Sequence, residues 1–166
     1  MLGIAKLHSD HDVSGFDCGV EALNIYLKRF ARQNQKAEAA QTYVALMDGV
    51  VIGYYTLVAG EIALDGAPER LRKGFGRYPV PMMLLARLAV QSGLQGRGVG
   101  SGLLRDATLK TIQAADIAGV RALVVDAKND AAFQFYRRHG FEPGFDSMFR
   151  LFMLVADIRR SMLGRQ

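Results

Sequence analysis

The sequence QGRGVG at residues 95–100 lies between a strand-like apolar run, LLARLAV at residues 84–90, and a helix-like run, SGLLRDA at residues 101–107. A glycine-rich turn that leads into a helix leaves several backbone N–H groups unpaired and aimed at one point. The helix dipole adds partial positive charge at the same place. Such a turn binds a phosphate or pyrophosphate group, although the sequence alone is also compatible with an ordinary tight turn.

The spacing of the glycines excludes two common phosphate-binding loops. A Walker A loop requires Gly, four residues and Gly-Lys-Ser/Thr, and the chain contains no such sequence. A dinucleotide-binding fingerprint requires G-x-G-x-x-G, but Ser101 or Leu103 stands where the third glycine should be. The pattern that remains is Gln/Arg-x-x-Gly-x-Gly, which resembles the pyrophosphate loop of the GNAT superfamily of N-acetyltransferases.

The composition favours one globular domain over residues 1–166. Half of the chain is hydrophobic and 22% is charged, which is sufficient for one sizeable core. The single cysteine, Cys18, excludes an internal disulfide and suits the reducing cytoplasm, and three scattered histidines predict no metal site. The longest apolar run, near residues 80–90, is interrupted by Arg87 and is too short to cross a membrane. The net charge of +5 permits a polyanionic partner without proving one.

Periodicity and turn residues predict a mixed α/β sheet. The Asp48-Gly49 pair between two β-branched and aromatic runs predicts a tight hairpin. The expected strands cover residues 2–7, 42–47, 50–58, 81–90, 121–126 and 148–156. The expected helices cover residues 20–37, 98–117 and 130–139, and residues 64–78 are expected to form a loop.

Two details of the helices follow from residue type. Leu23, Leu27 and Phe30 recur at helical spacing in the first helix and are expected to face the core. Asn129 or Asp130 is expected to cap the N-terminus of the third helix, because a side-chain oxygen there accepts from an unpaired backbone N–H.

The order of these elements resembles the GNAT fold, a mixed central sheet flanked by helices. In that fold two parallel strands splay apart, and the pantetheine arm of the coenzyme lies between them. Segments over most of the chain resemble one branch more closely, the GNAT toxins of bacterial toxin–antitoxin modules that acetylate aminoacyl-tRNA. The matching segments are FDCG (16–19), GYYTL (53–57), PVP (79–81), RLAV (87–90), QGRGVG (95–100), VDA (125–127) and FY (135–136) before GF (140–141). Gln91 departs from the acidic residue expected after the Ala-Val pair.

The resemblance implies that acetyl-coenzyme A is the acetyl donor and that no metal takes part. Leu88 and Val90, with Ala89 between them, are expected to bond the pantetheine through their backbones. The coenzyme is further expected to contact residues of the loop together with two residues at the helix expected over residues 130–139, namely Gln95, Gly96, Arg97, Gly98, Val99, Gly100, Ser101, Asn129 and Phe135. Alternatively, Arg97 is a solvated loop charge. A helix-cap role for Asn129 is equally expected, and Asn129 is able to fill both roles.

Two catalytic roles also come from the resemblance. The N–H of Leu88 is expected to hold the oxyanion, a contribution worth about 3–4 kcal/mol in other enzymes. Tyr136 is expected to act as general acid and to protonate the departing thiolate, because a phenol with a pKa of about 10 carries its proton at neutral pH. Without the resemblance, a tyrosine close to phenylalanines in the sequence would instead be predicted to be a core residue.

The strand before the loop contains no carboxylate that could serve as a general base. A lysine amine, with a pKa of about 10.4, requires such a base, whereas an α-amine with a pKa of about 7.7–8.0 is partly neutral already. The missing base therefore favours an α-amine as the acceptor, although Asp126 or Glu61 remains an alternative base.

The basic residues are grouped in a way that suits phosphate contacts with an RNA. The groups lie on the first expected helix, directly after Tyr136, and in the expected loop, which contains Arg70, Arg72, Lys73 and Arg77. The expected tRNA-binding residues are Lys28, Arg29, Arg32, Lys36, Arg87, Arg137 and Arg138. For each of them alone, a solvated surface charge is an equal alternative. The branch further implies a ribbon-helix-helix antitoxin, a homodimer and a cytoplasmic location.

Two other functions remain open at this point. A GNAT enzyme that acetylates a small-molecule amine or a protein N-terminus would not require a basic surface. A non-catalytic acyl-coenzyme A sensor would not require Tyr136.

Overall fold

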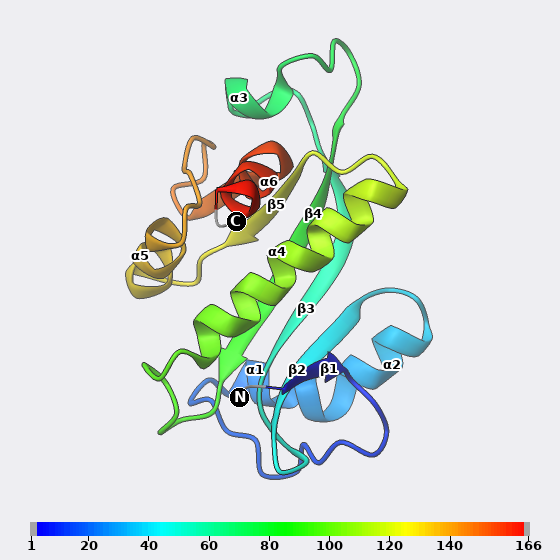
Figure 1. Ribbon diagram of the computed structural model, residues 1–166, viewed down its shortest axis with the longest axis vertical. Helices are drawn as coiled ribbons and strands as arrows, with labels where there is room; N and C mark the ends of the chain where they lie inside the picture. Colours follow the sequence, from blue (N-terminus) through cyan, green and yellow to red (C-terminus); the bar gives the residue numbers. More distant parts are fainter. Residues whose placement is uncertain (1–2, 165–166) are drawn as a thin grey trace. The chain divides into compact units, whose positions relative to one another are not determined.

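The computed structural model describes residues 3–164 (Figure 1). The chain divides into two compact units. Unit 1 contains the chain up to Val58 together with Ala86–Ala107, and unit 2 contains Ala59–Leu85 together with the chain from Thr108 onward. The elements that pass from one unit into the other are β3 (Val50–Ile62), β4 (Val80–Val90) and α4 (Val99–Ile117). Six strands form one sheet, in which the strand order follows the order of the sequence.

Unit 1 contains antiparallel strand pairs. β1 (Gly3–Lys6) pairs with β2 (Gln41–Met47), and β2 pairs with the beginning of β3. Asp48 and Gly49 connect β2 to β3 with φ angles of 50° and 80°. Two successive positive φ angles are the geometry that the right-handed twist of a hairpin favours, so the hairpin prediction is confirmed.

The first helical segment follows the predicted range closely but is not regular. It consists of α1 (Glu21–Ile25), the π-helical turn η1 (Tyr26–Phe30) and α2 (Ala31–Lys36). A π-helical turn contains more residues than an α-helical turn, and it changes which side chains face the core.

The π-helical turn overturns one prediction about the core. Leu27 is buried and Leu23 packs against the core of unit 1, as expected, but Phe30 is 47% exposed. Ala31 is buried in its place. The wider turn rotates Phe30 outward and brings the next residue to the core.

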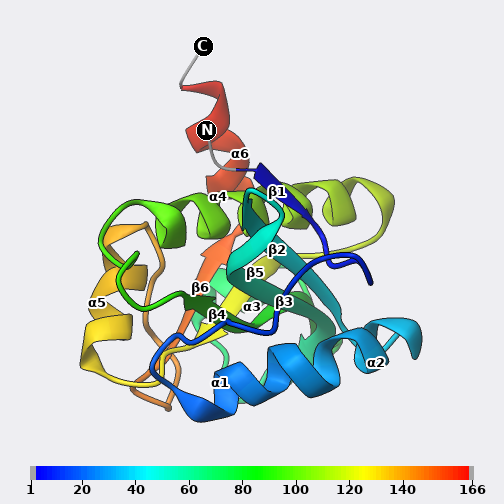
Figure 2. The same cartoon turned by 90° about the horizontal axis from the view of Figure 1, so that it is seen from below.

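Adjacent tyrosines of β3 show how helices cover both faces of the strands in unit 1. Side chains alternate along a strand, so Tyr54 and Tyr55 point to opposite faces, and both are fully buried. The Tyr54 hydroxyl donates to the carbonyl oxygen of Leu23 at 2.7 Å, whereas the Tyr55 hydroxyl donates to the carboxylate of Asp106 on α4 at 2.5 Å. Figure 2 shows α1 and α2 on one side of the strands and α4 on the other.

Unit 2 contains the parallel strand pair. β4 pairs in parallel with β5 (Ala122–Asp126) from Met82 and Ala122 to Leu85 and Val125, and β5 pairs antiparallel with β6 (Arg150–Leu154). The chain runs through α5 (Asp130–Arg138) between β5 and β6. Together with the antiparallel pairs of unit 1, this confirms a mixed α/β sheet flanked by helices.

The strand predicted over residues 148–156 is longer than the observed strand. The observed strand β6 ends at Leu154, and the chain then forms α6 (Val155–Leu163), a helix that was not predicted from the sequence. Val155 and Ile158 are both buried, and their spacing of three residues fits one face of a helix better than alternation along a strand.

The loop expected at residues 64–78 contains one short helix, α3 (Glu69–Arg72). Leu71 from this helix is fully buried and joins the core of unit 2 with Val80, Val124 and Phe152. Within residues 3–164, no helix is both long enough and apolar enough to span a bilayer.

Candidate active site

The glycine-rich loop has the backbone geometry that an anion site requires. Gly96 and Gly98 have φ angles of 79° and 88°, which L side chains rarely adopt. A Cβ atom placed on either glycine would meet no non-neighbouring atom of residues 3–164 within 4 Å, so this part of the structure leaves the surface of the loop open. α4 begins at Val99, within the glycine-rich sequence, and the first N–H groups of an α-helix lie outside its regular pattern of hydrogen bonds between residues i and i−4. These features fit a pyrophosphate.

The side chain of Gln95 attaches the glycine-rich loop to two neighbouring segments of unit 1 through hydrogen bonds. Its amide nitrogen donates to the carbonyl oxygen of Val90 at 3.0 Å and to that of Cys18 at 3.2 Å. These bonds tie the loop to the end of β4 and to the turn at residues 16–19. The sequence pattern identified Gln95 as a loop residue, but nothing in it indicated this anchoring role.

The neighbouring Gln91 and Ser92 attach the same turn to the end of β4. The Asp17 N–H donates to the side-chain oxygen of Gln91 at 3.0 Å, and the Ser92 N–H donates to the carbonyl oxygen of Asp17 at 2.8 Å. An acidic residue in place of Gln91 would also offer an oxygen acceptor here. The departure at Gln91 therefore leaves the contact intact.

A buried asparagine fixes the turn from its other side. The side-chain oxygen of Asn24 accepts from the Cys18 N–H at 2.9 Å, and its amide nitrogen donates to the Asp17 carboxylate at 3.0 Å. The same carboxylate accepts from the Gly19 N–H at 2.9 Å. The hydrogen bonds from Gly19 and Asn24 hold the pKa of Asp17 below its usual value. Asn24 was missed, because its position on a helix carries no recognisable motif.

The strand that leads to the loop places Leu88, Ala89 and Val90 in unit 1. Ala89 and Val90 are buried, and Leu88 is partly buried. Arg87 directs its guanidinium over the ring of Tyr26, 3.6 Å from the ring centroid. The guanidinium of Arg87 therefore makes a cation–π contact with a residue of the first helical segment.

Tyr136 lies on α5 in unit 2. Its ring is 6% exposed and makes edge contacts with Phe135 and Phe141, at centroid distances of 5.2 Å and 5.5 Å. Burial raises the pKa of Tyr136 above its usual value of about 10, so the phenol keeps its proton throughout the neutral range. A buried, protonated phenol is compatible with a general acid and also with a core residue.

The cap of α5 is Asn129, one of the two residues that the sequence predicted for it. The Asn129 side-chain oxygen accepts from the Ala132 N–H at 2.9 Å, and Asn129 is the N-cap residue. The capping alternative for Asn129 is therefore confirmed, and its contact with the coenzyme stays a prediction. Phe135 packs against Tyr136 and His139.

One alternative base is already occupied by an ion pair. Both carboxylate oxygens of Asp126 accept from the guanidinium of Arg150, at 2.8 Å and 3.0 Å. The hydrogen bonds to Asp126 raise the pKa of Arg150, and they engage both carboxylate oxygens, the atoms that a general base would use to accept a proton. Among residues 3–164, no group of three or more His, Cys, Asp or Glu side chains could hold a metal ion.

The basic residues of the first helical segment have different surroundings. Lys28, Arg29 and Lys36 are exposed. Arg32 is partly buried and donates to the carbonyl oxygens of His8 at 3.0 Å and His11 at 2.7 Å. Its charge therefore holds a loop of the protein, whereas the other three side chains extend into solvent.

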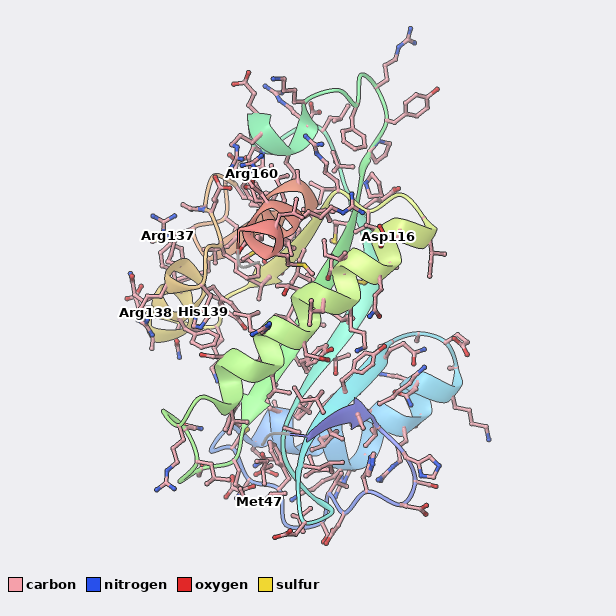
Figure 3. The ribbon with its side chains drawn as sticks, in the orientation of Figure 1. Met47, Asp116, Arg137, Arg138, His139 and Arg160 are labelled. Carbon is pink, nitrogen blue, oxygen red and sulfur yellow. The ribbon has the colours of Figure 1, made fainter. Side chains whose placement is uncertain are left out.

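Arg137 and Arg138 close α5 and are both exposed (Figure 3). Arg137 makes one long contact with the carbonyl oxygen of Phe141, at 3.5 Å. Cations at this end of a helix also complement its dipole.

The candidate coenzyme-binding and catalytic residues thus form two groups, one in each unit. Unit 1 brings together residues 88–90 with residues 95–101, through the contacts of Gln95. Unit 2 brings together Asn129, Phe135 and Tyr136 on one short helix.

The comparisons with known proteins agree with this geometry. A family model described as an acetyltransferase (GNAT) domain matches residues 38–143. A curated protein of Mycobacterium tuberculosis (strain ATCC 25618 / H37Rv), the tRNA-acetylating toxin, is 41% identical over 154 residues, covering 93% of this chain and 92% of its own. The chain therefore belongs to the GNAT acetyltransferases and, within them, to the family of toxins that includes this relative.

Two solved structures extend the comparison. AtaT complexed with acetyl-methionyl-tRNAfMet is 29% identical with a TM-score of 0.89, over 98% of this chain and 99% of that chain. A Tyr-to-Phe variant of AtaT, bound to the C-terminus of the antitoxin AtaR and acetyl-CoA, is also 29% identical with a TM-score of 0.83, over 99% of both chains. The similarity thus covers nearly the whole chain and confirms the GNAT fold.

Proposed function

We propose that this protein transfers an acetyl group from acetyl-coenzyme A to the α-amine of an aminoacyl-tRNA, and that it thereby acts as a translation-blocking toxin. The observation that carries the proposal is the 41% identity with a tRNA-acetylating toxin over 93% of the chain. The open, positive-φ loop at the start of α4 supplies the matching coenzyme site.

The loop residues hold the coenzyme by its pyrophosphate. The N–H groups of residues 96–101 are the proposed donors to the phosphate oxygens, and the dipole of α4 adds to the attraction for an anion. Arg97 is exposed and adds a full positive charge to the loop. Once bound, acetyl-coenzyme A supplies an acetyl group activated as a thioester.

The backbone of β4 positions the reacting carbonyl. The N–H of Leu88 donates to the carbonyl oxygen of the acetyl group and stabilises the negative charge that develops on it. Gln95 fixes the far end of this segment through its bond to the Val90 carbonyl. The loop and the catalytic segment therefore hold each other in place.

Tyr136 is the proposed general acid. Because its pKa is raised by burial, it carries the proton that the departing sulfur requires. Phe135 and Phe141 pack against its ring and restrict its orientation. The contacts of Asn129 and Phe135 with the coenzyme are part of the same proposal.

The acceptor amine needs little help from the protein. The strand residues from Ala86 to Val90 include no carboxylate, and Asp126 is paired with Arg150. An α-amine is partly neutral near pH 7, whereas a lysine amine is almost wholly protonated. An aminoacyl ester therefore suits this site better than a lysine side chain.

The tRNA is held by exposed cations. The best-placed candidates on the first helical segment are Lys28, Arg29 and Lys36, because their side chains extend into solvent. Arg137 and Arg138 are the candidates on α5. The sequence also predicts Arg32 and Arg87 as tRNA contacts. The Arg32 guanidinium donates to backbone carbonyl oxygens and the Arg87 guanidinium lies over Tyr26, so their contribution is expected to be smaller.

The proposal extends to the biological setting. A cognate antitoxin of the ribbon-helix-helix type neutralises the protein, which acts as a homodimer in the cytoplasm, where charged tRNA is found. The two compact units work as one acetyltransferase domain, since β3, β4 and α4 run through both of them.

The proposal is tested by incubating the protein with radiolabelled acetyl-coenzyme A and total tRNA. Two preparations are compared, charged tRNA and the same tRNA from which the amino acids are removed by mild alkali before the reaction. We expect label in the charged tRNA and none in the deacylated tRNA. Equal labelling of both preparations would place the acetyl group on the RNA itself, and labelling of neither, in a protein that acetylates small amines, would overturn the proposal.

A further inference from the structure

We infer that residues 72–78 of unit 2 form a second RNA-binding surface, separate from the cations of the first helical segment and α5, which contacts the unpaired end of the tRNA. The inference rests on the proposed function, since it assigns a new contact to the same substrate. The segment contains Arg72, Lys73 and Arg77, followed by Tyr78.

The base of this segment is fixed to the core of unit 2. Leu71 is fully buried, and the guanidinium of Arg121 donates to the carbonyl oxygen of Leu71 at 3.3 Å and to that of Arg70 at 3.0 Å. The same guanidinium lies 5.6 Å from the ring centroid of Phe75. The segment is therefore attached on both sides of Arg72 and Lys73.

Backbone hydrogen bonds within the segment hold its shape. The N–H of Phe75 donates to the carbonyl oxygen of Arg72, and the N–H of Tyr78 donates to that of Phe75, both at 3.0 Å. A surface element that is ordered before binding loses less conformational entropy when a ligand arrives.

Arg70 helps to attach the segment to the rest of unit 2 and is not part of the proposed RNA-binding surface. Its guanidinium forms ion pairs with Glu142 and Asp157. These two carboxylates raise the pKa of Arg70 and neutralise its charge locally. Arg70 is thus unlike the three cations that follow it.

Arg72, Lys73 and Arg77 are exposed, and none of them forms a side-chain hydrogen bond or ion pair with any of residues 3–164. Tyr78 is 76% exposed, although a tyrosine ring gains free energy when it is buried. A partner that covers this segment must therefore offer negative charge to three cations and a flat apolar face to one aromatic ring.

Unpaired nucleotides have both properties. Their phosphates neutralise Lys and Arg, and their bases stack on exposed aromatic rings. The acceptor end of a tRNA carries such nucleotides next to the amino acid. An acidic segment of the antitoxin would satisfy the cations but gives no particular role to Tyr78, so the structure favours the RNA.

The test compares three variants in steady-state acetylation of charged tRNA. They are the triple variant Arg72→Gln, Lys73→Gln, Arg77→Gln, the single variant Tyr78→Ala, and the control Lys6→Gln, which removes one exposed charge from β1. We expect the triple variant to raise KM for charged tRNA by at least tenfold and to flatten the log–log salt dependence by about 0.7 per lost phosphate contact. Tyr78→Ala should raise KM about tenfold with the salt slope unchanged, because stacking releases no counterions.

Affinity for acetyl-coenzyme A and kcat at saturating tRNA should stay at wild-type values in all three variants. If wild-type protein acetylates charged tRNA and the triple variant keeps its KM and salt slope, the inference is overturned while the proposed function survives. If the triple variant instead loses only antitoxin binding, the segment is a protein-binding surface and the inference is again overturned. Failure of wild-type protein to acetylate any charged tRNA overturns the proposed function itself.

Discussion

The side-chain amide of Gln95 donates a 3.0 Å hydrogen bond to the carbonyl oxygen of Val90, and thereby joins the glycine-rich loop to the strand that precedes it. The same amide reaches the carbonyl oxygen of Cys18. One side chain thus connects the loop, the end of β4 and the turn at residues 16–19. The proposed pyrophosphate site and the proposed oxyanion donor share this anchor.

Removing the anchor should weaken coenzyme binding. Gln95→Ala deletes two hydrogen bonds, each worth about 1 kcal/mol, and leaves the loop less ordered before the coenzyme arrives. We expect calorimetry to show a rise of about tenfold or more in Kd for acetyl-coenzyme A. The matched control is Gln41→Ala on β2, which should leave that Kd unchanged. Unchanged affinity in a folded Gln95→Ala protein would show that the loop keeps its shape without the anchor.

The loop itself is tested by Gly98→Asp. The φ angle of 88° at Gly98 disfavours any side chain, and the carboxylate would stand where the pyrophosphate is proposed to bind. The side chain meets open space, so the fold should survive while coenzyme binding is lost. Calorimetric titration of a variant shown to be folded by circular dichroism measures both effects. Wild-type affinity in that variant would remove the pyrophosphate from this loop.

Tyr136→Phe separates catalysis from binding. The substitution removes only the phenol oxygen, so ring packing against Phe135 and Phe141 is retained. We expect kcat to fall by about 10² or more, the usual scale for the loss of a general acid, with little change in Kd for acetyl-coenzyme A. A Phe variant that turns over at the wild-type rate would make Tyr136 a core residue, with another group protonating the sulfur.

The buried tyrosines also predict how stability depends on pH. Burial raises the pKa of Tyr54, Tyr55 and Tyr136 above the value of about 10 expected in the unfolded chain. Their contribution is therefore complete below about pH 10 and is lost as pH rises towards the folded-state pKa values, because only the unfolded chain then releases its protons.

Thermal unfolding between about pH 8 and pH 11 measures this dependence. We expect Tm to fall above about pH 10, and to fall less steeply in Tyr136→Phe than in wild-type protein. Tyr78→Phe, at an exposed position, should follow the wild-type curve. Identical curves for wild-type and Tyr136→Phe protein would show that Tyr136 ionises as freely in the folded state as in the unfolded chain.

Two sets of cations on the first helical segment should respond differently to substitution. Arg29→Glu with Lys36→Glu changes exposed charges, and should weaken binding of charged tRNA and flatten its salt dependence while Tm stays near the wild-type value. Arg32→Ala removes the hydrogen bonds to His8 and His11, and should lower Tm. Filter binding across a salt series and thermal unfolding measure the two effects. Wild-type tRNA affinity in the double variant would remove this helix from the RNA surface.

The strands, the main helices and the loop could be predicted from the sequence because each depends on local signals. Asp48-Gly49 marks the hairpin, and Asn129 marks the start of α5. Phe30 and α6 were predicted wrongly, since a π-helical turn and a strand that passes directly into a helix both interrupt the regular spacing on which the predictions relied.

The contacts that hold the site together could not be predicted in the same way. Gln95 and Asn24 meet the turn at residues 16–19 only after folding, and Arg32 finds its carbonyl partners on a distant loop. A residue type indicates what a side chain is able to donate or accept, but the partner is decided by the tertiary structure. This is why the cations of the first helical segment looked equivalent in sequence and are not equivalent in the fold.

The most direct test of the central claim is the mass of the product formed on the tRNA. Charged tRNA is treated with the protein and acetyl-coenzyme A and is then digested with nuclease, so that the terminal aminoacyl-adenosine is released for mass spectrometry. We expect an aminoacyl-adenosine that is heavier by one acetyl group, with the acetyl group on the α-nitrogen, and far less of it with Tyr136→Phe. Unmodified aminoacyl-adenosine after complete incubation with wild-type protein, or an acetyl group on the nucleotide instead, would contradict the account.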